Sequence, residues 1–238
     1  MLGVELAGRV GPLALSAAFD TSRGTVVLTG PNGSGKTSLL LMILGVLRPA
    51  RGRVTLGQSV LFDATTRVDV PVEKRSIGYV PQSYGLFPQL SALQNVEFAL
   101  ECRSRALGRS ERREKALALL AELGLTPHVA TQRPASLSAG ERQRVALARA
   151  IASEPNALLL DEPFAALDIG TRRQVRVFLR EYLERLALPT LVVSHDAADA
   201  RAIAQHVVVL EAGQVVQAGT FSELSASPAS PFVRELTM

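Results

Sequence analysis

Cysteine, aromatic residues and long apolar runs are scarce in this 238-residue sequence. It has one cysteine, Cys102, no tryptophan and 5% aromatic residues. A single cysteine excludes a disulfide framework and a cysteine metal site, and we expect a reducing, cytoplasmic setting. No apolar run reaches the roughly 18 residues of a membrane-spanning helix. Met1–Glu5 does not open like a signal peptide, so we expect no targeting segment.

Aliphatic residues and arginine are abundant instead. Hydrophobic residues make up 47% of the chain, enough for one large domain with a sizeable core. The net charge is +4, and the basic residues are spread along the sequence. This spread is typical of a solvated surface rather than of a nucleic-acid-binding stripe, so we expect no nucleic-acid partner.

One glycine-rich stretch, residues 30–37, organises the rest of the chain. It fits the phosphate-binding P-loop pattern G-x-x-x-x-G-K-[ST], and it lies between an apolar strand at Val26–Leu28 and an apolar helix at Ser38–Leu44. Gly33 and Gly35 allow a tight turn, and the N-terminus of the following helix attracts anions. The alternative, a glycine-rich turn that matches by chance, does not explain this strand–loop–helix context.

The P-loop predicts that the chain binds ATP and Mg²⁺. Lys36 would reach the β- and γ-phosphates, and the Thr37 hydroxyl would bind the metal ion. The predicted phosphate-binding residues are Gly30, Pro31, Asn32, Gly33, Ser34, Gly35, Lys36, Thr37 and Ser38.

Two acids follow a second buried strand, Ala157–Leu160. Open α/β sheets bind ligands at the carboxyl ends of their strands. Asp161 would therefore hold the Mg²⁺ that Thr37 also contacts, and Glu162 would accept a proton from the water that attacks the γ-phosphate. Alternatively, the two acids only begin a helix, although the P-loop makes that reading weaker.

Two more polar residues follow apolar strands. His195 comes after the strand Leu191–Val193, and it could bond the γ-phosphate and orient the attacking water. Gln82 comes after the strand Ile77–Val80, and its amide could reach Mg²⁺ or the same water. A structural histidine and an ordinary loop glutamine are the alternatives.

Near-continuous aliphatic strands alternate with helical patterns, which predicts an α/β fold: a P-loop NTPase core with a mainly parallel sheet covered on both faces. Strands on either side of Gly57 predict an antiparallel β subdomain, followed by a polar loop from Asp63 to Arg75. Beyond Glu223, proline and serine predict a loose tail.

The middle of the chain has no β-branched runs and has helical patterns at 91–100 and 110–123, which predicts an inserted α-helical subdomain. We expect a single domain over 1–238, with an α/β core at 1–82 and 154–238 and a helical subdomain at 83–153.

Ser138 and Glu141 have capping-box spacing at the start of a long helix. Its N-terminus offers a second anion site. A P-loop covers ATP from one side only, and hydrolysis requires the other side to be closed against water. A second copy of the chain could supply this helix end.

Together these motifs resemble one family, the ATP-binding subunits of ABC transporters. The resemblance extends from about Leu13 to Leu224, and its motifs come in the order of the family. The matching stretches are Gly30–Thr37 (Walker A), Gln82 (Q-loop), Leu137–Gln143 (signature), Leu158–Glu162 (Walker B), Ala166–Asp168 (D-loop) and His195 (switch histidine).

The resemblance implies a head-to-tail homodimer that holds two ATP molecules between its copies. Each nucleotide would lie between Walker A of one chain and Ser138, Ala139 and Gly140 of the other, with Asp168 in the D-loop close by. The resemblance also implies a location on the inner face of the cell membrane, transmembrane permease subunits and a periplasmic substrate-binding protein.

Tyr84 and Phe87 are candidates to line a groove that receives the permease, or they could equally be core residues. Within the family, importers of small oxyanions, especially molybdate-type importers, are most similar. The stretches that carry this finer resemblance are Val60–Asp63, Pro71–Arg75, Gly78–Val80 and Leu86–Pro88.

The finer resemblance implies import of molybdate, tungstate or another oxyanion, while sulfate, phosphate, iron and polyamines stay open. The alternatives are a soluble ABC-type ATPase that acts on nucleic acid or ribosomes, and a module that binds ATP without hydrolysing it.

Three departures from the family pattern stand out. Ala139 replaces the usual signature glycine, which would cost roughly 1 kcal/mol if the position needs a positive φ. Val10–Leu13 lacks the aromatic residue that usually stacks on adenine, so we expect aliphatic packing there, with Phe19 a less suitable substitute. The sequence stops at Met238, and we expect no C-terminal regulatory domain.

Overall fold

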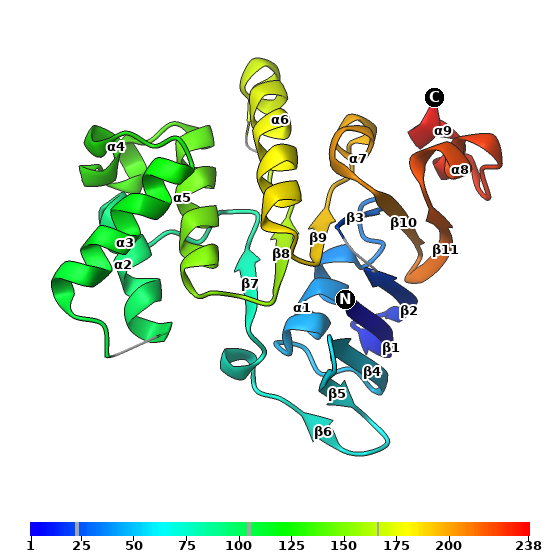
Figure 1. The fold of residues 1–238 in the computed structure, drawn as a ribbon. Helices are drawn as coiled ribbons and strands as arrows, with labels where there is room; N and C mark the ends of the chain where they lie inside the picture. The colour runs from blue at the N-terminus through cyan, green and yellow to red at the C-terminus, as the bar shows by residue number, and fades with distance from the viewer. Residues whose placement is uncertain (22–23, 104–105, 166) are drawn as a thin grey trace.

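The computed structural model describes residues 1–21, 24–103, 106–165 and 167–238. Its strands form one sheet with helices on both faces (Figure 1). The strands are β1 (Leu2–Val10), β2 (Leu13–Thr21), β3 (Thr25–Thr29), β4 (Arg51–Leu56), β5 (Ser59–Asp63), β6 (Val68–Asp69), β7 (Ile77–Val80), β8 (Ala157–Asp161), β9 (Thr190–Val193), β10 (His206–Glu211) and β11 (Gln214–Gly219). Their order across the sheet is β6-β5-β4-β1-β2-β11-β10-β3-β9-β8-β7.

The helices follow the predicted alternation with strands. They are α1 (Lys36–Leu44), α2 (Ala92–Arg103), α3 (Arg109–Glu122), α4 (Pro127–Thr131), α5 (Ala139–Ala152), α6 (Ile169–Leu186), α7 (Ala197–Ile203), α8 (Phe221–Ala226) and α9 (Pro231–Thr237). Within the ranges that the structure describes, no helix combines the length and the apolar character needed to cross a bilayer.

The sheet has a parallel half and an antiparallel half. Strands β10, β3, β9, β8 and β7 run parallel to their neighbours in that order. Strands β5, β4, β1 and β2 pair antiparallel. The structure thus confirms the predicted α/β fold, with its parallel core sheet and its antiparallel β region.

The parallel strands are buried on both faces, as their aliphatic sequences predict. Every residue of β3 is buried, and neighbouring residues enter different core clusters. Val26 and Leu28 pack with α1, whereas Val27 packs in the cluster that contains Val145 of α5. Side chains alternate across a strand, so one short strand fastens helices to both faces of the sheet.

The predicted loose tail is wrong in part, because α9 lies within it. The Ser230 side chain accepts a hydrogen bond from the backbone N–H of Val233, and Pro231 occupies the first turn of the helix. Serine and proline at these positions start a helix rather than break one. Val233 and Leu236 then bury the apolar side of α9.

The segment expected to be a polar loop, Asp63 to Arg75, contains β6, a short 3₁₀ turn and a fully buried arginine. The Arg75 side chain is 1% exposed. Its guanidinium donates hydrogen bonds to the carbonyl of Ile43 at 2.7 Å, to the carbonyl of Val70 at 2.7 Å and to the carboxylate of Asp69 at 3.0 Å. We call this set of contacts the Arg75 clamp, and it closes the C-terminal end of α1.

Candidate active site

The carboxyl ends of four neighbouring parallel strands bring the predicted site residues together. In the order β3-β9-β8-β7, these strands lead to the P-loop, to His195, to Asp161–Glu162 and to Gln82. Residues 124 positions apart, Thr37 and Asp161, are hydrogen bonded as a result. Open α/β sheets place ligands at this edge.

The P-loop is tight, and two of its glycines have little room for a side chain. A Cβ atom on Gly30, whose φ is 152°, would lie 1.9 Å from the carbonyl oxygen of Leu210. A Cβ atom on Gly35, whose φ is 102°, would lie 2.9 Å from the side chains of Leu13 and Leu15. The fold therefore requires glycine at both positions.

Lys36 places a buried cation inside this loop. Its side chain is 6% exposed, and Nζ donates to the carbonyls of Gly30 at 2.8 Å and Pro31 at 2.9 Å. Burial lowers the pKa of the Lys36 ammonium, and the negative charges of Glu162 and Asp161 act in the opposite direction. The loop thus has a positive centre that an anion would stabilise.

Two buried hydroxyls in this region, Thr29 Oγ1 and Ser34 Oγ, have no hydrogen-bond partner among the described residues. Buried hydroxyls are normally paired. Ser34 lies within the P-loop, and a phosphate oxygen would supply its missing acceptor. The glycine turns, the buried lysine and this free hydroxyl together fit a phosphate group.

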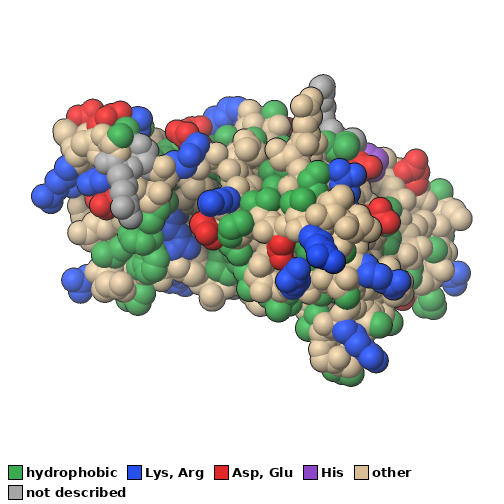
Figure 2. Space-filling view, turned by 90° about the horizontal axis from the view of Figure 1, so that it is seen from below, with side chains coloured by type: hydrophobic (Ala, Val, Ile, Leu, Met, Phe, Trp, Pro, Cys, Tyr) green, Lys and Arg blue, Asp and Glu red, His purple; other side chains and the backbone are tan. Residues whose placement is uncertain are grey.

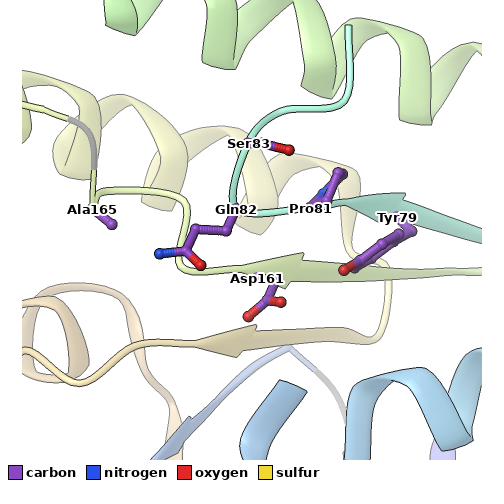
Figure 3. A pocket seen from close by; sticks show the side chains of 6 residues that line it. All are labelled: Tyr79, Pro81, Gln82, Ser83, Asp161 and Ala165. Atoms are coloured by element: carbon purple, nitrogen blue, oxygen red, sulfur yellow. The ribbon is translucent and has the colours of Figure 1, made fainter. Parts of the chain in front are cut away.

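Oxygen donors for a metal ion gather opposite the P-loop. Thr37 Oγ1 donates to Asp161 Oδ1 at 3.3 Å, and the Asp161 side chain is buried. A pocket of about 480 Å³ has Gln82, Tyr79 and Asp161 in its lining. In Figure 3 the Gln82 amide and the Tyr79 hydroxyl lie on either side of the Asp161 carboxylate. Hydroxyl, carboxylate and amide oxygens are the donor types that Mg²⁺ accepts.

No cluster of three acidic, histidine or cysteine residues able to hold a metal ion occurs in the described ranges. Mg²⁺ does not need such a cage, because it commonly binds one or two protein groups together with phosphate oxygens and water. The residues present therefore fit Mg²⁺ that arrives with a nucleotide.

Tyr79 is a site residue that the sequence did not identify. Its hydroxyl lies beside the Asp161 carboxylate in the pocket (Figure 3), and burial together with that carboxylate raises the pKa of Tyr79 to about 12. Burial also raises the pKa of Asp161, and the neighbouring charge of Glu162 adds to this, while the hydroxyls of Thr37 and Tyr79 oppose it. The only signal in the sequence was a hydroxyl in an otherwise apolar strand, β7.

Glu162 and His195 form the second contact pair of the site. Glu162 Oε2 lies 2.7 Å from His195 Nδ1, and the two side chains are 14% and 53% exposed. Glu162 has a left-handed backbone, with φ of 49°. This conformation costs a non-glycine residue roughly 1–2 kcal/mol, and such strain gathers at functional sites. A carboxylate and an imidazole thus meet at the edge of the sheet that also carries the P-loop.

The capping box predicted at Ser138 and Glu141 is present at the start of α5. Ala139 is the first residue of the helix and does not belong to the described residues with positive φ, so the strain expected for alanine does not arise. A Cβ atom on Gly140 would lie 3.3 Å from Thr171 of α6. In Figure 1, β7 and β8 lie between α5 and α1. Ser138 and Gly140 line a pocket with Thr171 and Val175 of α6 rather than with the P-loop of the same chain.

Asp168 caps α6, because its carboxylate accepts the backbone N–H of Thr171 at 3.0 Å. Of the predicted D-loop, Ala166 lies outside the described residues.

Val10–Leu13 forms the turn between β1 and β2, and it brings Leu13 against Gly35. Phe19 packs instead in the core beside this sheet. The aliphatic contact to the P-loop thus comes from Leu13.

A groove of about 610 Å³ runs between β7 and α2, and Phe87, Phe98, Cys102 and Arg149 help to line it. The Phe87 and Phe98 rings meet edge to face, with centroids 4.9 Å apart, and the Arg149 guanidinium lies over Phe87. Phe98 is 44% exposed. Tyr84 is 4% exposed and belongs to the core, so of the two candidates only Phe87 lines the groove, which we call the Phe87 groove.

Arg149 ties α5 to the segment that follows Gln82. It donates to the carbonyl of Gly85 at 2.6 Å and to the carbonyl of Tyr84 at 3.1 Å.

On the face seen in Figure 2, basic side chains are scattered among acidic and apolar ones rather than gathered in one stripe.

A family model described as ABC transporter matches residues 16–165. Among curated proteins, the chain is 43% identical over 208 residues to a sulfate/thiosulfate import ATP-binding protein, CysA, of Nephroselmis olivacea, with 87% of this chain and 58% of that protein covered. It is 40% identical over 223 residues to a molybdenum import ATP-binding protein, ModC, of Brucella abortus (94% and 60%). It is 42% identical over 213 residues to an Fe(3+) ions import ATP-binding protein, FbpC, of Rhizobium etli (89% and 58%).

The chain thus spans about 60% of the length of these curated relatives. Among solved structures it is similar to the ATP-binding cassette MJ0796, described as dimeric in a post-hydrolysis state bound to ADP and Pi. That match has a TM-score of 0.76 and 29% identity, and it covers 92% of this chain and 98% of the other. None of these names refers to nucleic acid or ribosomes, so the alternative function has no support.

Proposed function

The chain belongs to the ABC transporter family, and on this premise we propose that it is the ATP-hydrolysing subunit of an importer. The observation that carries the proposal is the arrangement of two contact pairs beside the P-loop. Thr37 lies 3.3 Å from Asp161, and Glu162 lies 2.7 Å from His195. The first pair suits a metal ion on a phosphate, and the second suits proton transfer from water.

In this proposal the P-loop backbone and Lys36 bind the phosphates of ATP. Thr37, Asp161 and Gln82 hold Mg²⁺, which would offset the negative charge of the phosphate oxygens. Glu162 accepts the proton of the attacking water, and His195 bonds the γ-phosphate.

The proposed working form is a homodimer with ATP between the copies. Ser138, Ala139, Gly140 and Asp168 of the second copy would complete each site, because α5 lies away from the P-loop of its own chain (Figure 1). The dimeric state named for the similar cassette MJ0796 supports this arrangement. We also keep the division into a core at 1–82 and 154–238 and a helical subdomain at 83–153 as a proposal.

The proposed partner of the Phe87 groove is a helix of a permease subunit, which would place the chain at the inner face of the cell membrane, in a system with a periplasmic substrate-binding protein. Exposed Phe98 and the partly exposed ring of Phe87 give the groove its apolar lining. The import relatives support this partner.

The proposed cargo is a small oxyanion such as molybdate or tungstate. Two of the relatives described above are named for sulfate/thiosulfate and molybdenum import, which supports this chemical class. The third is named for Fe(3+) import. Uptake of molybdate and sulfate by vesicles that contain the permease complex would decide, and Fe(3+) uptake alone would contradict the oxyanion class.

Cys102 offers a direct test of the permease contact, because it is the only cysteine of the chain and it is exposed in the groove. We expect a short thiol-reactive crosslinker on Cys102 to capture a membrane-embedded subunit when the complex is isolated in mild detergent. The matched control is the double variant Cys102→Ser, Ser225→Cys, which moves the thiol to exposed Ser225 of α8. Equal capture from both positions would contradict the proposed docking site.

A further inference from the structure

Two aspartates beside His195 are tied to α6 by arginines that the proposed chemistry does not use. Arg176 donates to Asp199 Oδ1 at 2.5 Å and to Asp196 Oδ2 at 3.1 Å. Arg172, one helical turn earlier, donates to the same Asp196 oxygen at 2.9 Å. The Asp199 side chain is 4% exposed, so this is a largely buried charge cluster.

The same cluster fixes the backbone on both sides of His195. Ser194 Oγ donates to Asp199 Oδ2 at 2.6 Å and accepts the backbone N–H of Asp196 at 3.2 Å. Asp196 Oδ1 accepts the backbone N–H of Ala198 at 2.7 Å, which caps α7. We call Arg172, Arg176, Ser194, Asp196 and Asp199 the arginine–aspartate cluster.

A small pocket of about 10 Å³ lies where this cluster meets Glu162 and His195. So little space means that the Glu162–His195 pair packs closely against the cluster and cannot move further toward it. The geometry of that pair, 2.7 Å between Glu162 Oε2 and His195 Nδ1, therefore depends on the position of α6.

α6 itself begins at the turn that the proposal places against the second nucleotide. Asp168 accepts the backbone N–H of Thr171 at 3.0 Å, and its carbonyl accepts the backbone N–H of Arg172 at 2.8 Å. One helical turn thus links the Asp168 turn rigidly to the first arginine of the cluster.

We propose that the arginine–aspartate cluster is a positioning device for hydrolysis, which holds His195 against Glu162 and sets that pair according to the position of the Asp168 turn. This inference rests on the proposed ATPase function. The residues of the cluster are positioning residues, because they act through His195.

Arginine is required for this task at position 176. Its planar guanidinium reaches two carboxylates at once, whereas a lysine offers one ammonium point charge on a flexible stem. If the cluster only stabilised the fold, a positive charge at position 176 would suffice. If it positions His195, the two-pronged guanidinium is also needed, because it fixes both aspartates. The difference between Arg176→Lys and Arg176→Met therefore separates the two roles.

The experiment measures ATP turnover of the full chain and its Arg176 variants, each first checked for folding by thermal melting. We expect Arg176→Met to lower kcat roughly 10- to 100-fold with KM for ATP changed less than about twofold, because only the orientation of the reacting groups is disturbed. Arg176→Lys should recover the melting temperature but less than half of the lost kcat. The control Arg180→Met, exposed on the same helix, should match the parent.

A double variant tests whether the effect passes through His195. If the cluster acts by placing the imidazole, Arg176→Met should cost nothing further in a His195→Ala background. The proposal would be overturned if the loss of kcat in the double variant equalled the product of the losses in the two single variants. A folded Arg176→Met variant with the kcat of the parent would also overturn it.

A readout independent of turnover uses the imidazole signals of ¹⁵N-histidine-labelled protein, which contains three histidines. Arg176→Met should shift the His195 signals and leave those of His128 and His206 unchanged, and an unchanged His195 signal would contradict the proposal. If the parent chain itself hydrolyses no ATP, the proposed function fails, whereas this spectroscopic test still decides the placement of His195.

Discussion

The two ends of α1 treat buried polar groups in opposite ways. At the N-terminal end, Ser34 Oγ is buried without a partner among the residues that the structure describes, and the buried Lys36 ammonium bonds the backbone carbonyls of Gly30 and Pro31. At the C-terminal end, the Arg75 clamp pairs Arg75 with Asp69 and with the carbonyls of Ile43 and Val70. Buried polar groups at the N-terminal end of α1 can therefore still form hydrogen bonds, whereas those at the C-terminal end are already paired.

This difference separates a site for binding from a site for support. Unpaired buried hydroxyls and charges cost stability, so they are retained where a ligand completes them. A guanidinium over the last carbonyls of a helix neutralises the negative end of the helix dipole and needs nothing further. Gly45 shows how closely the clamp is built, because a Cβ atom there would lie 2.5 Å from the Arg75 guanidinium carbon.

The largest expected effect lies at the N-terminal end, where Glu162→Gln removes the proposed base. We expect turnover to fall about 10²- to 10⁴-fold while ATP binding is retained, because an amide cannot accept the proton of the attacking water. Phosphate release measures turnover, and light scattering with ATP should show a trapped dimer. Glu181→Gln, exposed on α6, is the control. Hydrolysis at the parent rate by Glu162→Gln would show that the base is another group.

The next effect tests the C-terminal end. Arg75→Met should lower the free energy of unfolding by about 1–3 kcal/mol, because it leaves the carbonyls of Ile43 and Val70 without their buried donor. Arg48→Met should lower it by less than about 1 kcal/mol, because Arg48 contacts the same Asp69 from solvent at 3.5 Å. Urea unfolding measures both variants. Comparable losses would mean that burial does not distinguish the two arginines.

Lys36→Ala returns to the N-terminal end with the opposite expectation. ATP affinity measured by calorimetry should fall roughly 10- to 100-fold, because hydrogen bonds to charged phosphates are lost. The melting temperature without nucleotide should not fall, because a desolvated cation is removed. Lys74→Ala, at an exposed position, should bind ATP like the parent. Undiminished affinity in Lys36→Ala would remove the basis for the P-loop assignment.

The smallest effect concerns Tyr79, whose hydroxyl lies beside the Asp161 carboxylate near the N-terminal end of α1. Tyr79→Phe should lower the free energy of unfolding at pH 9 by about 0.5–1.5 kcal/mol. The pKa of Tyr79 is raised to about 12, so its contribution is complete below pH 10 and is lost as the pH rises toward 12. The difference from the parent should therefore shrink between pH 9 and pH 11. A constant difference would indicate that the hydroxyl contributes nothing through its proton.

The sequence predicted the parts of the site that follow strands. The Asp161–Glu162 pair directly follows an aliphatic run, and His195 follows another after Ser194. The parallel order of the strands then brings these residues to one edge. This inference needed only local patterns and one rule of sheet topology.

The features that the sequence did not reveal depend on contacts between distant segments. Arg75 is buried because the C-terminal end of α1, more than 30 residues earlier, supplies its acceptors. Arg172 and Arg176 look like an exposed helical face until α7 brings Asp196 and Asp199 against them. The α9 helix was missed for a local reason, since Ser230 and Pro231 were interpreted as breakers rather than as a helix start.

One residue, Ser83, separates the amide that enters the pocket from the carbonyls that Arg149 holds. A residue of extended chain spans at most about 3.3–3.6 Å, so this tether has little slack. A displacement of α5 would therefore reach Gln82 through a single intervening residue. A partner in the Phe87 groove that moved Arg149 would therefore also move Gln82, which lines the pocket that contains Asp161.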